Sequence, residues 1–496
     1  MRQARRHLPT AWVALALAVT AAATAAGCGG DDDGTTLPPV DILDGLRALP
    51  EVASVEELGT NQTGYRYFML QFDQPVDHEH PERGRFQQMA TLIHRDAAAP
   101  MVLAHTGYGN WIFDFPLEPT RLLAANQLVI EHRFFRASRP AGGLADWAHL
   151  TIAQAAADDH RIVAALRPLY DGAWIETGAS KGGMTSVYHR RFYPDDVDGT
   201  LAYVAPISFA APDYRYEPHV EQLGPPACRQ ALRDLQADLL RNRRQMLIDR
   251  ATSQAMTRSY SYNRITLPAA VESAVVALEW SFWQFEGAAS CPTVPPVTTS
   301  DAQAWAFLEQ VSPVSSSSDF ELIEFEAYYL QAEGELGYPG TMDEHLAGLV
   351  TFPTAAYDGV YPPGVAVPSY QAQAMADIDA WVKADGERLI FLYGEWDPWS
   401  GGTFTLGGAT DSLRVVAPMA PHGAGIDDLT AADRDLVLAR LEAWTGVTPA
   451  RRGDRSRLAP PPPAPRPPSA WVRLRARNIA PTVDPAGPGA MVKPGR

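Results

Sequence analysis

The chain has 496 residues, of which 46% are hydrophobic and 20% charged, a globular composition that excludes wholesale disorder and fibrous repeats. Its net charge is −17, and because phosphate binding needs a basic face, we expect no nucleic-acid partner. Residues 451–496 carry +8 and residues 1–30 carry +3, which leaves −28 on residues 31–450. Three cysteines are too few for a disulfide-built fold or a multi-cysteine zinc module.

The start of the chain has the layout of a secretory signal. Three arginines precede an apolar stretch at 11–26, which is short beside the roughly 20 apolar residues of a membrane span. Small residues then lead to Cys28, as in a bacterial lipobox, although Ala25 stands where leucine is usual. We predict export, with a signal peptide at 1–27, a lipid anchor on Cys28 as the only membrane attachment, and a polar linker at 28–40. Plain cleavage and secretion is the alternative.

Residues 41–206 are predicted to alternate strands with helices. A helix is expected at 152–169, where apolar residues recur at helical spacing. The predicted strands are 66–72, 87–93, 101–104, 128–130, 173–177 and 201–205. This alternation predicts an α/β fold with a mostly parallel sheet, whose first part is 41–206.

The pattern changes at 207–375, where helices and aromatic residues dominate, and we interpret this segment as a helical lid inserted into the sheet domain. Its predicted helices are 228–252, 269–285, 301–311 and 319–333. The second part of the sheet domain is predicted at 376–448, with strands at 388–393 and 413–417 and a helix at 431–445. Residues 449–496 contain a run of prolines and many arginines, which predicts a disordered basic tail.

Two cysteines remain once Cys28 is assigned to the lipobox. Export would place Cys228 and Cys291 in an oxidising compartment, so we expect a disulfide between them. Two buried thiols are the alternative.

The segment Gly178-Ala-Ser180-Lys181-Gly182 fits the pattern G-x-S-x-G. It follows an apolar strand and precedes a helix-like segment, which is the strand–turn–helix setting of a nucleophile elbow. Glycines flank the serine because a Cβ in so tight a turn would collide with the neighbouring strand and helix. The pattern predicts that Ser180 is a nucleophile and that the backbone N–H of Lys181 faces an oxyanion. An ordinary glycine loop is the alternative.

A serine nucleophile needs a base, and the base needs an orienting carboxylate. In α/β-hydrolases they follow the serine in the order Asp, His, each after a strand. Asp397 and His422 follow the two late strands, so Asp397 is expected to orient the imidazole and His422 to move the proton. Glu395 is an alternative carboxylate, whereas Asp427 and Asp428 follow His422 too closely to lie on a separate strand end.

The second oxyanion donor is expected in the glycine-containing loop after an early strand, from the backbone of Tyr108 or Gly109. A tight turn without a catalytic role is the alternative. His105 ends that strand and could line the site. His78 and His80 form an H-x-H pair with no further ligand at zinc spacing, so we predict no metal and no other cofactor.

Several segments of the chain carry a family resemblance. They are 131–135 (EHRFF), 146–147 (DW), 150–154 (LTIAQ), 176–185 (ETGASKGGMT), 191–194 (RFYP) and 203–206 (YVAP). They resemble the secreted tripeptidyl aminopeptidases of actinomycetes, serine peptidases of the prolyl tripeptidyl aminopeptidase type that are distantly similar to lysosomal Pro-Xaa carboxypeptidase.

The resemblance spans roughly 40–447 and implies an α/β-hydrolase with a helical lid and the triad Ser180, Asp397 and His422. It also implies release of N-terminal tripeptides, often with proline at the cleaved bond. Family members tend to carry Asn-Asp where this chain has Ile207-Ser208, a difference that concerns substrate preference more than catalysis.

An aminopeptidase must also bind the ammonium group of its substrate, and a buried cation needs a counter-charge. Glu333 and Glu335 of the lid are candidates, although most such carboxylates are simply solvated. Trp283 or Phe285 could form a pocket for proline or belong to the lid core. We therefore predict an exported serine aminopeptidase that acts on peptides. A serine esterase or lipase and a non-catalytic cell-surface binding protein are the alternatives.

Overall fold

The computed structural model describes residues 41–110 and 114–450. The chain divides into two compact units, Met1–Asp41 and Ile42–Arg496, and the fold described below belongs to the second. The predicted signal (1–27), the linker with Cys28 (28–40) and all but the first two residues of the predicted tail (449–496) lie outside the described residues. Within the described part, no helix is both long and apolar enough to cross a bilayer.

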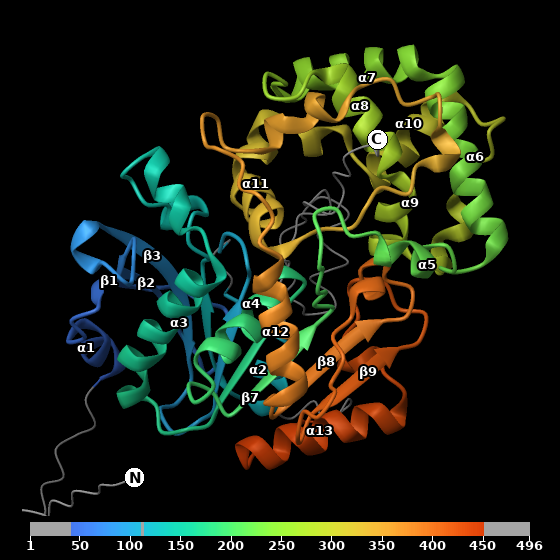
Figure 1. Cartoon of the computed structure of the whole chain (residues 1–496). Helices are drawn as coiled ribbons and strands as arrows, with labels where there is room; N and C mark the ends of the chain where they lie inside the picture. Colours follow the sequence, from blue (N-terminus) through green and yellow to red (C-terminus); the bar gives the residue numbers. More distant parts are fainter. Residues whose placement is uncertain (1–40, 111–113, 451–496) are drawn as a thin grey trace, which may run out of the picture. The chain divides into compact units, whose positions relative to one another are not determined.

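A nine-stranded sheet forms the centre of this unit (Figure 1). Its strands are β1 (Val52–Leu58), β2 (Arg66–Pro75), β3 (Arg85–His94), β4 (Met101–His105), β5 (Asn126–Ile130), β6 (Trp174–Ala179), β7 (Gly199–Tyr203), β8 (Leu389–Gly394) and β9 (Leu413–Ala417). They lie in the order β1-β2-β3-β5-β4-β6-β7-β8-β9. The pairs from β1 to β5 are antiparallel and those from β5 to β9 are parallel. The predicted mostly parallel α/β sheet is confirmed; β1 was not predicted.

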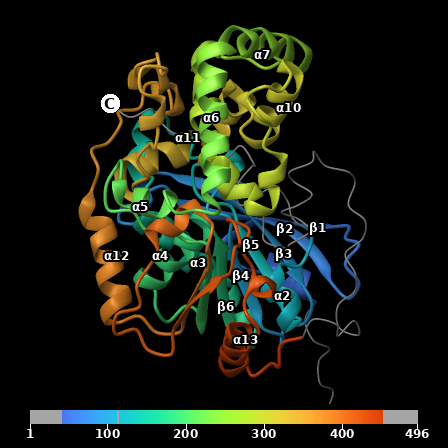
Figure 2. The same cartoon turned by 90° about the vertical axis from the view of Figure 1, so that its right-hand side faces the viewer.

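Helices cover both faces of the sheet, as Figure 2 shows. They are α1 (Ile42–Arg47), α2 (Glu118–Leu123), α3 (Ile152–Leu166), α4 (Lys181–Phe192), α12 (Ala372–Ala384) and α13 (Ala431–Thr445). Because side chains alternate along a strand, Val102 of β4 packs in the core shared with α13, while Met101 and Leu103 pack in the core shared with α3. The sheet is therefore buried on both sides, as a parallel sheet requires.

A helical insertion separates β7 from β8 and lies above the sheet in Figure 1. Its helices are α5 (Glu217–Val220), α6 (Pro226–Asn242), α7 (Arg244–Arg258), α8 (Leu267–Val276), α9 (Leu278–Ser281), α10 (Asp301–Val311) and α11 (Asp319–Gln331). Two π-helical turns, Phe282–Glu286 and Ala332–Leu336, follow α9 and α11. We call the segment from α5 to the second π-helical turn the lid.

The lid differs from its prediction in three details. The single helix expected at 228–252 is two helices, because the chain leaves helical geometry at Arg243. The helix expected at 269–285 is α8, α9 and a π-helical turn. The expected lid boundary at 375 falls inside α12, which packs on α4 of the sheet domain.

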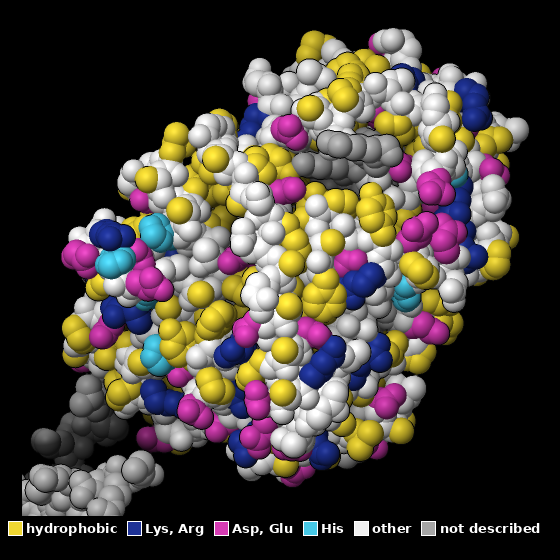
Figure 3. Space-filling view, viewed as in Figure 1, with side chains coloured by type: hydrophobic (Ala, Val, Ile, Leu, Met, Phe, Trp, Pro, Cys, Tyr) yellow, Lys and Arg dark blue, Asp and Glu magenta, His cyan; other side chains and the backbone are white. Residues whose placement is uncertain are grey.

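A disulfide joins Cys228, near the start of α6, to Cys291, with the two Cα atoms 5.5 Å apart. The predicted pairing is thus present. Figure 3 shows that acidic and basic side chains are interspersed over the face seen in Figure 1. The net negative charge is therefore not gathered into one patch on that face.

Candidate active site

Ser180 lies in the turn between β6 and α4 with φ 56° and ψ −126°, a backbone conformation that is rare for a residue with a Cβ. Its N–H donates to the carbonyl of Tyr203, and its own carbonyl accepts from the N–H of Met184 at 2.9 Å, which begins α4. A Cβ on Gly182 would lie 2.1 Å from the carbonyl oxygen of His105. The glycine lets α4 approach β4 closely, so the strained serine is held by the packing around it.

Asp397 and His422 are brought together from the loops after β8 and β9. Asp397 Oδ2 and His422 Nδ1 are 2.7 Å apart, and Asp397 Oδ1 accepts the N–H of Trp399. Both side chains are buried, and His422 Nε2 has no hydrogen-bond partner among the described residues. Glu395, the alternative carboxylate, is exposed and accepts the N–H of Met419 instead. The geometry therefore favours Asp397.

Two lid residues hold these loops in place, and no sequence pattern predicts either contact. The carbonyl of Gln284, in the first π-helical turn, accepts the N–H of His422 at 3.0 Å. His219 Nε2, at the end of α5, lies 2.9 Å from the carbonyl oxygen of Asp397. The lid thus fixes the main chain at both Asp397 and His422.

The backbone N–H groups expected as oxyanion donors have different environments. Lys181 opens α4, where helical N–H groups lack intrahelical partners. The N–H of Tyr108 donates to Thr106 Oγ1 at 3.0 Å, so the prediction of a free backbone donor at Tyr108 is wrong. The N–H of Gly109 has no partner among the described residues.

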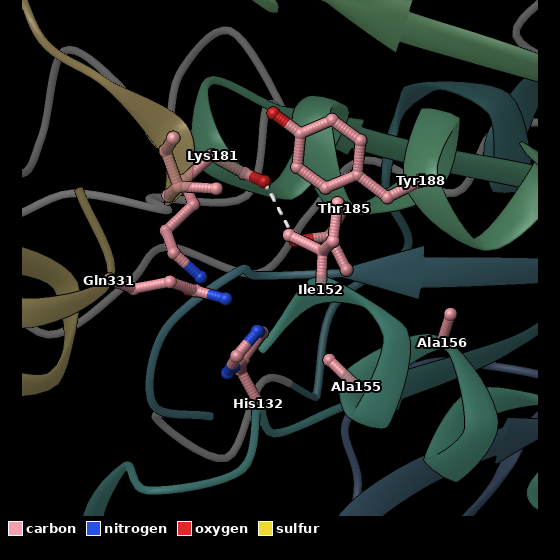
Figure 4. A pocket seen from close by; sticks show the side chains of 9 residues that line it. His132, Ile152, Ala155, Ala156, Lys181, Thr185, Tyr188 and Gln331 are labelled. Atoms are coloured by element: carbon pink, nitrogen blue, oxygen red, sulfur yellow. Dashed lines mark hydrogen bonds between the residues drawn. The ribbon is translucent and has the colours of Figure 1, made fainter. Parts of the chain in front are cut away.

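The side chain of Lys181 is an unpredicted feature of the site. It is buried, and Nζ donates to the carbonyl of Gly107 at 2.7 Å. Burial lowers the pKa of this ammonium to about 7, against the opposing charges of Asp159 and Glu335. Lys181 and His132 are among the residues that line a cavity of about 10 Å³, enough for one water molecule. Figure 4 shows these lining side chains.

The two lid carboxylates proposed for amine binding have separate environments. Glu335 accepts the N–H of Ile152 at the start of α3 at 2.8 Å, and burial raises its pKa to about 7. Glu333 accepts the hydroxyl groups of Tyr338 and Tyr361 at 3.0 and 2.6 Å. Glu333 also lines a cavity of about 450 Å³. This cavity is large enough for a ligand, and Glu335 is not among the residues that line it.

The two aromatic residues proposed to bind substrate also have different environments. Trp283 is completely buried, with its ring perpendicular to that of Phe282 and in contact with Gly224. It belongs to the lid core, which corrects its proposed role in substrate binding. Phe285 is half-buried in the π-helical turn that contacts the His422 loop.

Three further histidines, His105, His189 and His78, contact carboxylates. Glu176 Oε1, in the core, accepts hydrogen bonds from His105 Nε2 at 2.6 Å and from His189 Nδ1 at 2.7 Å, so His105 does not line the site as expected. The ligand atoms of His105, Glu176 and His189 lie within 4.8 Å of one another, the one cluster among the described residues that could hold a metal ion. The hydrogen bonds account for the cluster without one. His78 is paired with Asp158 at 2.7 Å.

The strand order and the position of Ser180 between β6 and α4 define an α/β-hydrolase. Residues 37–479 match the family described as PS-10 peptidase S37. A prolyl tri/tetrapeptidyl aminopeptidase of Streptomyces mobaraensis is 37% identical over 454 residues, which cover 90% of this chain and 93% of the relative. The chain therefore belongs to the PS-10 peptidase S37 family and is a serine peptidase. The resemblance inferred from the sequence is confirmed.

Solved structures are more distant. An esterase of Thermogutta terrifontis is 14% identical, with a TM-score of 0.28, over 79% of this chain and 100% of the esterase. The peroxisomal alpha-beta-hydrolase Lpx1 of Saccharomyces cerevisiae is 11% identical, with a TM-score of 0.33, over 77% of this chain and 89% of that protein.

Proposed function

We propose that this chain is an exported serine aminopeptidase that releases N-terminal tripeptides through an acyl-enzyme on Ser180. The observation that carries the proposal is the buried hydrogen bond of 2.7 Å between Asp397 and His422. It holds Nδ1 as the donor and leaves Nε2 as the base, the tautomer that activation of a serine requires. The first step transfers the Ser180 proton to His422 as Oγ bonds to the substrate carbonyl carbon, and His422 then returns that proton to the leaving amine.

The substrate ammonium group is proposed to bind Glu333. A carboxylate is needed there because an unpaired buried cation is costly. Glu333 lines the cavity of about 450 Å³, together with Arg264, Asp358 and a wall of proline and valine residues. Tyr338 and Tyr361 donate hydrogen bonds that hold the Glu333 carboxylate in place.

Peptide length, proline preference and export rest on other observations. The name of the Streptomyces mobaraensis relative describes prolyl tri- and tetrapeptidyl release by that protein, and we extend tripeptide release with proline at the cleaved bond to this chain. Export rests on the signal-like residues 1–27, with a lipid anchor at Cys28 or release after cleavage as its two forms.

The test is to measure kcat/KM for a proline-containing tripeptide substrate with a free or an acetylated amine. Acetylation removes the positive charge that Glu333 would pair, at a cost of about 3 kcal/mol or more for a broken buried ion pair. We therefore expect kcat/KM to fall at least about 10²-fold. Glu333→Gln should lower kcat/KM for the free peptide similarly and leave the acetylated peptide unchanged.

The control variants separate recognition from catalysis. Glu344→Gln changes an exposed carboxylate that follows the lid in the chain and should leave both substrates unaffected. Ser180→Ala should abolish turnover of both and prevent labelling by a fluorophosphonate. Equal cleavage of free and acetylated peptides would contradict an aminopeptidase and favour an endopeptidase, and preferential cleavage of short-chain esters would favour an esterase.

A further inference from the structure

The loop after β4, residues 106–110, lies against the nucleophile elbow, and we call it the β4 loop. β4 runs parallel to β6 with His105 opposite Gly178, so the loop begins beside the elbow. Gly107 has φ +74°, and a Cβ there would lie 2.6 Å from the carbonyl carbon of Lys181. Only glycine permits so close a contact in this conformation. In α/β-hydrolases a loop in this place supplies one of the two oxyanion donors.

The side chain of Lys181 holds the β4 loop in this position. Its Nζ donates to the carbonyl of Gly107 at 2.7 Å. Nζ also lies 5.7 Å from the centre of the Tyr108 ring and 5.6 Å from that of Phe135, within the range of a cation–π attraction. The side chain is 2% exposed, so water does not compete for this hydrogen bond. The loop is thus tied to the residue that directly follows the nucleophile.

Other hydrogen bonds hold the remainder of the β4 loop. The N–H of His132 donates to the carbonyl of Tyr108 at 2.9 Å. On the far side, Glu131 Oε2 accepts the N–H of Asn110 at 2.7 Å. Gly109 lies between these two contacts, and its N–H has no partner among the described residues. The fold therefore holds the loop on both sides of this N–H.

A buried ammonium group is an expensive way to fill this space. It loses its hydration, whereas an apolar side chain of similar length would pack there without that cost. The other lysine among the described residues, Lys383, is exposed and pairs with Asp379 at 2.7 Å. The burial of Lys181 therefore indicates a role for its ammonium group, and the group that it holds is the carbonyl of Gly107.

We propose that Lys181 sets both halves of the oxyanion hole: its backbone N–H is one donor, and its ammonium group holds the β4 loop that supplies the other. In this second role Lys181 is a positioning residue, which acts through the carbonyl of Gly107 and neither gives nor takes a proton. When Ser180 Oγ bonds to the substrate carbonyl carbon, both donors must reach the same oxygen, so the loop has to be fixed before the reaction. The inference rests on the proposed function of Ser180 as the nucleophile.

The experiment compares Lys181→Met with wild type, because methionine keeps the backbone N–H and a side chain of similar length but cannot donate to Gly107. Misplacing a positioned group by about 1 Å can cost about 10²-fold, so kcat should fall by up to that factor with little change in KM. The melting temperature reports whether the variant folds. Lys181→Gln, which is polar but one bond too short to reach the carbonyl, gives the same comparison should Lys181→Met not fold.

Two inhibitors show whether the loss concerns the oxyanion hole. A tripeptide aldehyde forms a tetrahedral adduct with Ser180 and should bind Lys181→Met more weakly by the same factor as kcat falls. The matching tripeptide alcohol cannot form the adduct and should bind as it does to wild type. Lys383→Met removes the exposed lysine and is the control, which should retain wild-type kcat and aldehyde affinity.

Wild-type kcat in Lys181→Met would overturn the proposal. A raised KM with unchanged kcat would also overturn it, because the ammonium group would then act in substrate binding. So would a lower kcat with unchanged aldehyde affinity, since the adduct would then not depend on the loop. Fluorophosphonate labelling of Ser180→Ala at the wild-type level would instead contradict Ser180 as the nucleophile, and so distinguishes failure of the proposed function from failure of this inference.

Discussion

Beneath the elbow, a buried row of acidic and basic side chains ties α4 to the sheet. Glu176 of β6 accepts from His189 of α4 at 2.7 Å, and His189 also contacts Asp196 at 3.0 Å. Burial alone would raise the pKa of Glu176, but the charge of His189 and hydrogen bonds from His105 and His189 lower it to about 2. Burial opposes protonation of His189, yet Glu176 and Asp196 raise its pKa to about 10.

These shifts predict how stability depends on pH. Because folding lowers the pKa of Glu176, its carboxylate stabilises the folded state fully above pH 4.5, and this stabilisation is lost as pH falls towards 2. Because folding raises the pKa of His189, its imidazolium stabilises the folded state fully below pH 6.5, and this stabilisation is lost as pH rises through 10. Glu176→Gln should therefore cost about 3–5 kcal/mol of unfolding free energy near pH 5.5, the scale for a broken buried pair. The cost should shrink towards pH 2.5 and 10.

Denaturant unfolding of wild type and Glu176→Gln at pH 3, 5.5 and 9.5 measures this difference. Glu344→Gln, an exposed change, is the control and should differ from wild type by less than about 0.5 kcal/mol at each pH. A difference for Glu176→Gln that is equally large at all three pH values would show that the ion pair is not its cause.

Single residues also show what the sequence could and could not predict. Ser180, Asp397 and His422 were predictable because each follows a strand, and the ends of parallel strands meet at one edge of the sheet. The engagement of the Tyr108 N–H within its own loop was not, because it depends on where the fold places the Thr106 hydroxyl. No local pattern encodes such contacts.

At the scale of elements, the lid was predictable as helical but not in its breaks. The spacing of apolar residues indicates which segments are helical but not where a helix breaks. Because α6 and α7 continue the same helical spacing on either side of Arg243, the sequence predicts one helix. The π-helical turns shift the spacing by one residue, so the sequence could not decide that Glu333 faces a cavity and Glu335 reaches α3.

The disulfide between Cys228 and Cys291 closes a loop of 63 residues that holds α6, α7, α8 and α9. In the chain-entropy model, a loop of this length stabilises the fold by about 4 kcal/mol. Replacing both cysteines by serine should lower the unfolding free energy by up to that amount, while kcat below the new melting temperature stays the same. Calorimetry with and without a reductant measures it, and a wild-type melting point insensitive to full reduction would contradict the prediction.

At the scale of the whole molecule, the lid is part of the catalytic arrangement rather than a cover. Gln284 and His219 hold the loops of His422 and Asp397, and Glu335 caps α3. A sequence with the triad order alone would not reveal this dependence, because each contact joins residues more than 100 positions apart. The sheet domain without its insertion would lack fixed positions for two of the three triad residues.

Ala450 is buried, and its N–H donates to the carbonyl of Leu122 at 2.8 Å, so the sheet domain extends slightly past the predicted boundary at 448.

A chain ending at Arg451 keeps this contact and loses only the proline-rich, basic remainder, whose composition cannot build a core. We expect it to match the full chain in melting temperature and in kcat/KM. A chain ending at Thr448 removes the buried Ala450 and its hydrogen bond, worth about 1 kcal/mol, and should melt about 1–3 °C lower with kcat/KM unchanged. Thermal melts and tripeptide hydrolysis of the three chains decide the matter. A loss of stability or activity already in the chain ending at Arg451 would show that residues 452–496 bind to the sheet domain or the lid.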